Sequence, residues 1–155
     1  MPKVSVIINT FNRPYMLKQA VASVLTQTLA DWQIVISLDI HYAVSDDTTR
    51  YCNWLASGDQ RVKLDYTDLL NWNDRSINRF AHNINRAFKL CTGDYISYLC
   101  DDDLFLPWRL SVFSRVLDEN PEYQVVYGKQ MVLDIPTQKF TEEIFHKENW
   151  TEVAA

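Results

Sequence analysis

The sequence contains few glycines, and their positions exclude two common ways of binding phosphate. Only Gly58, Gly93 and Gly128 occur among 155 residues. Neither the GxGxxG fingerprint of dinucleotide-binding folds nor the Walker loop of P-loop NTPases can be written with them. Any phosphate group bound by this chain would therefore have to be neutralised by side chains or a metal ion, because no glycine-rich turn is available.

Cysteine, basic residues and long apolar runs are scarce as well. Three cysteines without CxxC spacing predict neither a disulfide framework nor a zinc ribbon and favour a reducing compartment. A formal net charge of −5 argues against the basic face that nucleic-acid binding requires. No apolar run reaches membrane-spanning length, and no basic region leads an apolar segment at the N-terminus. We expect a cytoplasmic protein with no membrane span and no nucleic-acid partner.

Catalytic signatures built on serine, cysteine or histidine are also missing. The sequence has no GxSxG motif and no cysteine–histidine signature, so hydrolases of those kinds have no support. His41, His82 and His146 show no metal-ligand spacing, and scattered histidines are usually structural or surface groups. The candidate site must therefore be sought among carboxylates, arginines and aromatic side chains.

Apolar runs alternate with segments of helical periodicity, which predicts βαβ units and a largely parallel sheet. A hydrophobic content of 47% is sufficient for one continuous core, with residues 1–133 as the domain and 134–155 as a polar tail. Strands are predicted at Val4–Ile8, Trp32–Leu38, Val62–Leu64, Tyr95–Leu99 and Gln124–Leu133. Helices are predicted after Pro14 (apolar face Leu17, Ala20, Val21, Val24, Leu25), from a cap at Ser45–Asp47 to Gly58, before Gly93 (apolar face Ile77, Phe80, Ala81, Ile84, Ala87, Phe88) and from Pro107.

Chemically useful side chains follow three of the predicted strands directly. In open α/β sheets, ligands bind beyond the carboxyl ends of the strands. These positions hold Thr10-Phe11-Asn12-Arg13, Asp39 and Asp101-Asp102-Asp103. An aromatic ring, a cation and several carboxylates at one edge suit a ligand that combines a base, a sugar and phosphates.

The aspartate triplet is the strongest of these signals. Adjacent like charges after a buried strand repel one another, and a divalent cation would supply the missing counter-charge. Hard oxygen ligands select Mg²⁺ or Mn²⁺, and such a cation can bridge a carboxylate to substrate phosphates. The alternative is a solvated loop whose aspartates cap the helix near Pro107. The residues by themselves leave both interpretations open.

The other candidates also have two interpretations each. Phe11 is suited to stacking on a nucleobase or to packing in the core. Asp39 is suited to accepting a hydrogen bond from a base edge, such as uracil N3–H, or to a turn. Arg13 and Arg79 would neutralise a diphosphate, or else lie on the surface as ordinary solvated charges.

Three segments together resemble family 2 glycosyltransferases, and among them enzymes of bacterial spore-coat polysaccharide synthesis. The resemblance covers about residues 2 to 133 and rests on Pro2–Pro14, Ser23–Thr28 and Gly93–Leu110, the last with the segment that carries a DxD motif in the family. It implies a GT-A fold, a Rossmann-like layered α/β domain with helices on both faces of the sheet. It also implies transfer of a sugar from a nucleotide-diphosphate donor, with a UDP-sugar favoured, to an acceptor hydroxyl with inversion and with Mn²⁺ or Mg²⁺.

The resemblance assigns roles to matching positions. Thr10, Phe11 and Arg13 would surround the base and phosphates, Asp39 would contact the base, Arg79 would assist the nucleotide, Asp101 would lie near the ribose, and Asp102 would bind the metal. The register of the motif is open because Cys100 stands where many members have its first aspartate, so Asp103 is a further candidate ligand.

Two departures limit what the resemblance implies. The segment Ser37–His41 keeps one acid where the family usually has a pair of aspartates followed by glycine. Family members place acceptor recognition and the general base beyond the equivalent of Leu133, so residues 134–155 would at most begin that part and the base is unassigned. The alternative function is a nucleotide-binding module without transfer activity, either a truncated product or a subunit that needs a partner chain. A homodimer or a partner chain is expected as the assembly. A phosphotransferase is disfavoured by the missing phosphate loop.

Overall fold

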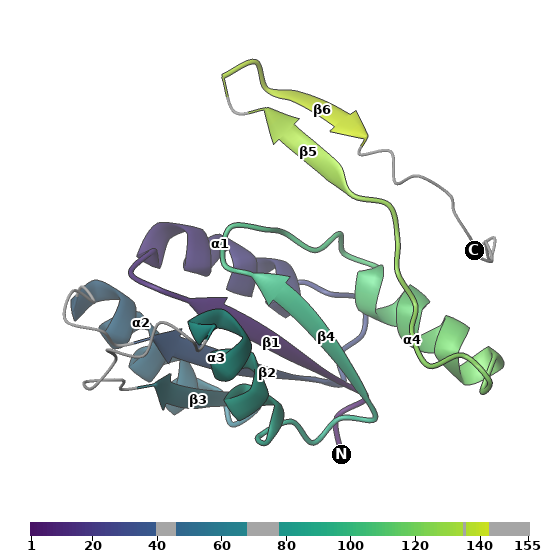
Figure 1. The fold of residues 1–155 in the computed structure, drawn as a ribbon, viewed down its shortest axis with the longest axis horizontal. Helices are drawn as coiled ribbons and strands as arrows, with labels where there is room; N and C mark the ends of the chain where they lie inside the picture. Colours follow the sequence, from purple (N-terminus) through teal and green to yellow (C-terminus); the bar gives the residue numbers. More distant parts are fainter. Residues whose placement is uncertain (40–45, 68–77, 135, 143–155) are drawn as a thin grey trace. The chain divides into compact units, whose positions relative to one another are not determined.

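The computed structural model describes residues 1–39, 46–67, 78–134 and 136–142. The chain divides into two compact units, Met1–Ser114 and Arg115–Ala155. The first unit holds the larger sheet (Figure 1) and every predicted site residue, whereas the second holds a two-stranded sheet. The predicted boundary at residue 133 remains a prediction.

A four-stranded parallel sheet in the order β3-β2-β1-β4 forms the centre of the first unit. All four strands were predicted in place, because each is a short apolar run bounded by polar residues. Their bounds are β1 (Val4–Thr10), β2 (Trp32–Asp39), β3 (Val62–Thr67) and β4 (Tyr95–Cys100), and the helices are α1 (Pro14–Leu25), α2 (Asp46–Gly58), α3 (Arg79–Phe88) and α4 (Arg109–Glu119).

Helices cover both faces of this sheet, as predicted (Figure 1). Side chains alternate between the two faces of a strand, so each strand contributes to two clusters. One cluster joins alternate residues of β1 and β2 to α1, α2 and Leu110 at the start of α4. The other joins Ile7 and Val35 to Ala87 of α3. The core is therefore thick on one face and thin on the other.

Helices α1 and α3 place their residues partly as predicted. Pro14 opens α1, where its missing N–H is not needed, and Leu17, Ala20, Val21 and Val24 are buried. Leu25 is 42% exposed, contrary to the prediction, because it lies in the last turn of the helix. Phe80 and Phe88 of α3 are also exposed, at 47% and 57%. The buried residues of α3 are Asn83 and Ala87, and Ile84 packs against the same core cluster as Ala87.

Gly93 fixes how β4 enters the sheet beside β1. A Cβ at this position would lie 2.7 Å from the backbone nitrogen of Ser5 and 2.9 Å from the carbonyl carbon of Val4. The close approach lets the Gly93 N–H donate to Ser5 Oγ at 2.9 Å, while Ser5 Oγ donates to Gln33 Oε1 at 2.7 Å. The start of β4 is thereby tied to β1 and β2.

The last predicted strand is mostly wrong. Among the described residues of the second unit, strand structure is found in β5 (Met131–Asp134) and β6 (Lys139–Glu142), which pair antiparallel. Residues 124–130 form no strand although they include the apolar run Val125–Tyr127, and Val125 and Tyr127 are 77% and 49% exposed. Without burial of alternate side chains, the apolar pattern has nothing to stabilise an extended pairing there. The predicted cap at Ser45 lies outside the described residues.

Candidate functional site

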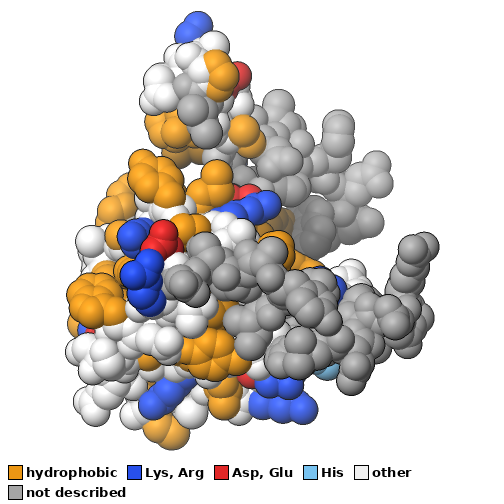
Figure 2. Space-filling model, turned by 90° about the vertical axis from the view of Figure 1, so that its left-hand side faces the viewer, with side chains coloured by type: hydrophobic (Ala, Val, Ile, Leu, Met, Phe, Trp, Pro, Cys, Tyr) orange, Lys and Arg blue, Asp and Glu red, His pale blue; other side chains and the backbone are white. Residues whose placement is uncertain are grey.

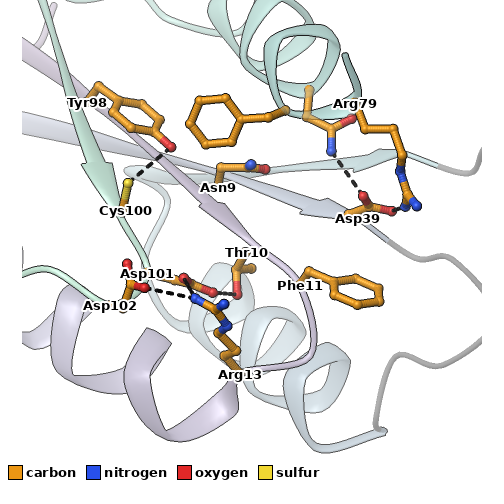
Figure 3. A pocket seen from close by; sticks show the side chains of 12 residues that line it. Asn9, Thr10, Phe11, Arg13, Asp39, Arg79, Tyr98, Cys100, Asp101 and Asp102 are labelled. Carbon is orange, nitrogen blue, oxygen red and sulfur yellow. Dashed lines mark hydrogen bonds and ion pairs between the residues drawn. The ribbon is translucent and has the colours of Figure 1, made fainter. Parts of the chain in front are cut away.

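A cavity of about 480 Å³ lies at the carboxyl edge of the parallel sheet. This volume is within the range usual for small-molecule sites, about 300 to 1,000 Å³. Figure 2 faces the side toward which β1, β2 and β3 point, and there Lys or Arg side chains lie beside Asp or Glu among hydrophobic ones. Of the predicted residues, all except Asp103 line the cavity (Figure 3): Thr10, Phe11, Arg13, Asp39, Arg79, Asp101 and Asp102.

The register of β1 and β4 brings Thr10 and Asp101 together at the edge of the sheet. Asn9 pairs with Cys100 across β1 and β4, so the next residues, Thr10 and Asp101, lie side by side. Thr10 Oγ1 donates a hydrogen bond to Asp101 Oδ2 at 2.8 Å, and both side chains are buried. Asn12, with φ of 52°, turns the chain between β1 and α1, a conformation that asparagine tolerates better than most residues.

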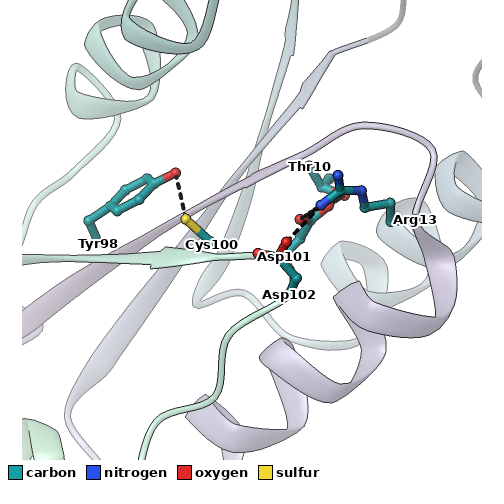
Figure 4. A network of polar contacts seen from close by, with 6 residues as sticks. All are labelled: Thr10, Arg13, Tyr98, Cys100, Asp101 and Asp102. Atoms are coloured by element: carbon teal, nitrogen blue, oxygen red, sulfur yellow. Dashed lines mark hydrogen bonds and ion pairs between the residues drawn. The ribbon is translucent and has the colours of Figure 1, made fainter. Parts of the chain in front are cut away.

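Arg13 is the cation of this group. Its Nη1 lies 3.3 Å from Asp101 Oδ1 and 2.9 Å from Asp102 Oδ2 (Figure 4). One guanidinium thus forms ion pairs with two carboxylates, and the next residue in the sequence, Asp103, is a third acid. Because negative charge exceeds positive charge in this group, a further cation would be stabilised there.

A cluster suited to a divalent cation adjoins the same carboxylates. One ligand atom from each of Cys100, Asp102 and Asp103 lies within 4.8 Å of the others. Burial raises the pKa of Asp103, and the neighbouring Asp102 carboxylate adds to the effect. Two carboxylate oxygens and a sulfur form a donor set that fits a divalent cation, with the oxygens favouring Mg²⁺ or Mn²⁺ and the sulfur a softer ion.

The opposite side of the cavity is built around Asp39. This residue ends β2, is 7% exposed, and forms an ion pair with Arg79 of α3. Asn83 Nδ2 donates to the second carboxylate oxygen, Oδ2, at 3.4 Å. The Arg79 guanidinium lies 6.0 Å from the centre of the Phe11 ring, which is 43% exposed at the rim. Phe11 is therefore not a core residue, and its face is available to a ligand.

Five residues of the cavity wall were not predicted from the sequence. They are Asn9, Phe80, Asn83, Tyr98 and Cys100. The period of two along the strands could have revealed Asn9 and Tyr98, since both share the sheet face on which Asp39 lies. Cys100 Sγ donates weakly to Tyr98 Oη at 3.6 Å, and burial raises the pKa of the Tyr98 phenol, which keeps it protonated. Asn83 had no usable signal, because a helical asparagine is normally expected on the surface.

Among the described residues, no helix is both long and apolar enough to cross a membrane.

Relatives of known sequence match most of this chain but only part of their own length. CgeD of Bacillus subtilis (strain 168) is 34% identical over 153 residues, which is 93% of this chain and 32% of CgeD. The GalNAc(5)-diNAcBac-PP-undecaprenol beta-1,3-glucosyltransferase of Campylobacter jejuni is 33% identical over 132 residues, 85% of this chain and 39% of that protein. The chain therefore spans about a third of the length of these relatives.

Solved structures share the fold. The structure of S. aureus TarS residues 1–349 in complex with UDP has a TM-score of 0.61 at 19% identity, covering 77% of this chain and 33% of that one. The mannosyltransferase PcManGT of Pyrobaculum calidifontis, in complex with GDP-Man and Mn²⁺, has a TM-score of 0.52 at 21% identity, covering 74% and 31%. The family model described as Glycosyl transferase family 2 matches residues 5–152. This chain, with its GT-A type α/β fold, belongs to glycosyl transferase family 2.

Proposed function

We propose that this chain binds a nucleotide-diphosphate sugar, with a UDP-sugar favoured, and transfers the sugar to an acceptor hydroxyl with inversion. The observation that carries the proposal is the meeting of three strand ends in one cavity of about 480 Å³. That cavity offers an exposed aromatic ring, two arginines and a set of carboxylates. The ligands named for two proteins of the same fold, UDP in TarS and GDP-Man with Mn²⁺ in PcManGT, are of the class that this lining suits.

The base would bind between Phe11 and Asp39. The exposed face of Phe11 suits stacking, and the Asp39 carboxylate suits an N–H such as N3–H of uracil. Arg79, which pairs with Asp39 and lies over the Phe11 ring, would close this end of the cavity. The base end then has an apolar surface and one directional acceptor.

The sugar and phosphates would lie toward Asp101 and Arg13. Thr10 holds the Asp101 carboxylate in place, which suits it to accept from the ribose hydroxyls. The Arg13 guanidinium is half-exposed, and a diphosphate would compete with Asp102 for it. Release of Asp102 from Arg13 would leave its oxygens for a cation.

Asp102, with Asp103 and Cys100 as neighbours, would hold Mn²⁺ or Mg²⁺ as the DxD motif of this chain. A bound divalent cation supplies Lewis-acid stabilisation of a departing diphosphate. The residues around it keep their own tasks, since Arg13 balances the phosphate charge and Asp101 orients the ribose. Transfer also requires a general base for the acceptor hydroxyl, and that residue is unassigned.

Residues 1–133 would form the donor-binding part, and residues 134–155 would begin the acceptor-binding part. The location would be cytoplasmic, and a homodimer or a partner chain would complete the acceptor site. The acceptor is a carbohydrate or another hydroxyl compound.

Calorimetric titration of UDP tests the donor site, first with Mn²⁺ and then with a chelator in excess. UDP should bind tightly only when Mn²⁺ is present. In Asp102→Ala, Mn²⁺ should no longer increase the affinity for UDP. Equal UDP affinity with and without Mn²⁺, together with an unchanged affinity in Asp102→Ala, would contradict the metal assignment.

Because the chain spans only 32% of CgeD, a nucleotide-binding module without transfer is the second candidate. Turnover of a UDP-sugar by the 155-residue chain separates the two functions.

A further inference from the structure

Helix α3 presents two donors, one turn apart, to a single carboxylate. Arg79 pairs with Asp39 Oδ1 (Figure 3). Asn83 Nδ2 donates to Asp39 Oδ2 at 3.4 Å. Residues four apart lie on the same side of a helix, so both reach the end of β2 together. Both oxygens of Asp39 are therefore engaged from the same direction.

The Asn83 amide has only one favourable orientation. Its Nδ2 faces the Asp39 carboxylate, and turning the amide over would place Oδ1 against a second acceptor. The residue is 1% exposed, and the backbone carbonyl of Asn83 accepts from Ser37 Oγ at 3.3 Å. Because Ser37 and Asp39 both belong to β2, this turn of α3 is anchored to the strand that carries the carboxylate.

The burial of Asn83 has no explanation from packing. An apolar residue at this position would extend the contact that Ala87 makes with Ile7 and Val35. A buried amide is costly unless it is hydrogen-bonded, yet Asn83 Oδ1 has no partner in the described part of the chain. The one side-chain hydrogen bond that Asn83 makes there is the bond to Asp39. An asparagine at this position therefore serves Asp39 rather than the core.

We propose that Asn83 is a positioning residue for nucleobase selection, acting through Asp39. With a donor on each oxygen, the carboxylate cannot rotate freely, and its remaining lone pairs require a donor from the ligand. Uracil presents N3–H at that edge, whereas cytosine presents an unprotonated N3 that the carboxylate repels. Asn83 thus increases the preference for UDP over CDP. This inference rests on the proposed binding of the base at Asp39.

The test is the ratio of the dissociation constants of CDP and UDP, measured by calorimetry on the 155-residue chain at a fixed Mn²⁺ concentration. Asn83→Leu, which keeps the side-chain size, should lower the ratio by about tenfold, the worth of one hydrogen bond to a charged group. Asp39→Asn should bring the ratio near one, because an amide can donate to cytosine or accept from uracil. Asn85→Leu is the matched control, since Asn85 is exposed on the same helix; it should leave the ratio unchanged.

The possible results separate the inference from the function on which it rests. Equal weakening of UDP and CDP in Asn83→Leu would show a structural role only and would overturn the inference. An unchanged ratio in Asn83→Leu alongside a collapsed ratio in Asp39→Asn would also overturn it, while the proposed function would stand. An unchanged ratio in Asp39→Asn would remove the base site at Asp39, and the inference would fall with it.

Discussion

Arg13 should have opposite effects on the two ligands of the proposed site: it weakens binding of the cation and strengthens binding of the nucleotide. Arg13→Gln tests both effects in one variant. In the structure, its guanidinium lies on the carboxylate that would bind the cation, 2.9 Å from Asp102 Oδ2. Removing Arg13 frees that carboxylate and also raises the local negative charge. We therefore expect Mn²⁺ alone to bind more tightly to the variant, whereas UDP in the presence of saturating Mn²⁺ should bind more weakly.

The exposed fractions of the two side chains limit the expected change in Mn²⁺ affinity. The side chains of Arg13 and Asp102 are 53% and 50% exposed, so their ion pair is worth about 1 kcal/mol or less. Loss of this competitor should raise the Mn²⁺ affinity by no more than about fivefold. A charge-assisted hydrogen bond to a phosphate is worth about 1.5 to 3 kcal/mol, so UDP should lose about ten- to a hundredfold in affinity.

Electron paramagnetic resonance of free Mn²⁺ measures the first quantity, and calorimetry of UDP measures the second. Arg50→Gln is a matched control, because Arg50 pairs with Asp47 on α2 and does not line the cavity. It should change neither affinity. Weaker Mn²⁺ binding by Arg13→Gln would refute the reasoning, since it would mean that the guanidinium does not compete with the cation.

Three further predictions concern the fold and the cysteines. Gly93→Ala should lower the free energy of unfolding by about 1 to 3 kcal/mol in urea titrations, because its Cβ would lie 2.7 Å from the Ser5 nitrogen; an unchanged midpoint would contradict the close approach. Cys100→Ser should weaken Cd²⁺ binding more than Mn²⁺ binding and abolish the ultraviolet absorption of a cadmium–thiolate bond, because sulfur prefers the softer ion. Such absorption persisting in the variant would rule out Cys100 as the ligand. Burial raises the pKa of Cys52 from 9.0 to about 11, so its contribution to stability is complete below pH 9 and is lost as pH rises toward 11. Cys52→Ala should flatten this alkaline decline in thermal unfolding scans, and an equally steep decline would argue against the shift.

The parts of the fold that were predictable are those in which burial and periodicity coincide. The runs that became β1, β2 and β4 are apolar, short and bounded by polar residues, and the side chains just beyond them had to meet at one edge of a parallel sheet. The gathering of Thr10, Asp39 and Asp101 around one cavity follows from that geometry. The helix after Pro14 was predictable for the same reason, since its apolar residues share one face.

Prediction failed where tertiary contacts decide. The sequence around Asn83 suggests a helix with an apolar face, yet the contact with Asp39 and the anchor at Ser37 turn the asparagine inward. Phe80 and Phe88 are left exposed as a result. The strand predicted at Gln124–Leu133 was also too long. Residues 124–130 form no strand, and the side chains of Val125 and Tyr127 are exposed. Local pattern cannot supply such long-range partners.

A crystal structure of the 155-residue chain with UDP and Mn²⁺ tests the central claim most directly. The account predicts an anomalous manganese peak at Asp102, with the uracil ring against Phe11 and its N3–H directed at Asp39. A nucleotide bound outside this cavity, or a manganese peak away from the Asp102 carboxylate, would contradict it.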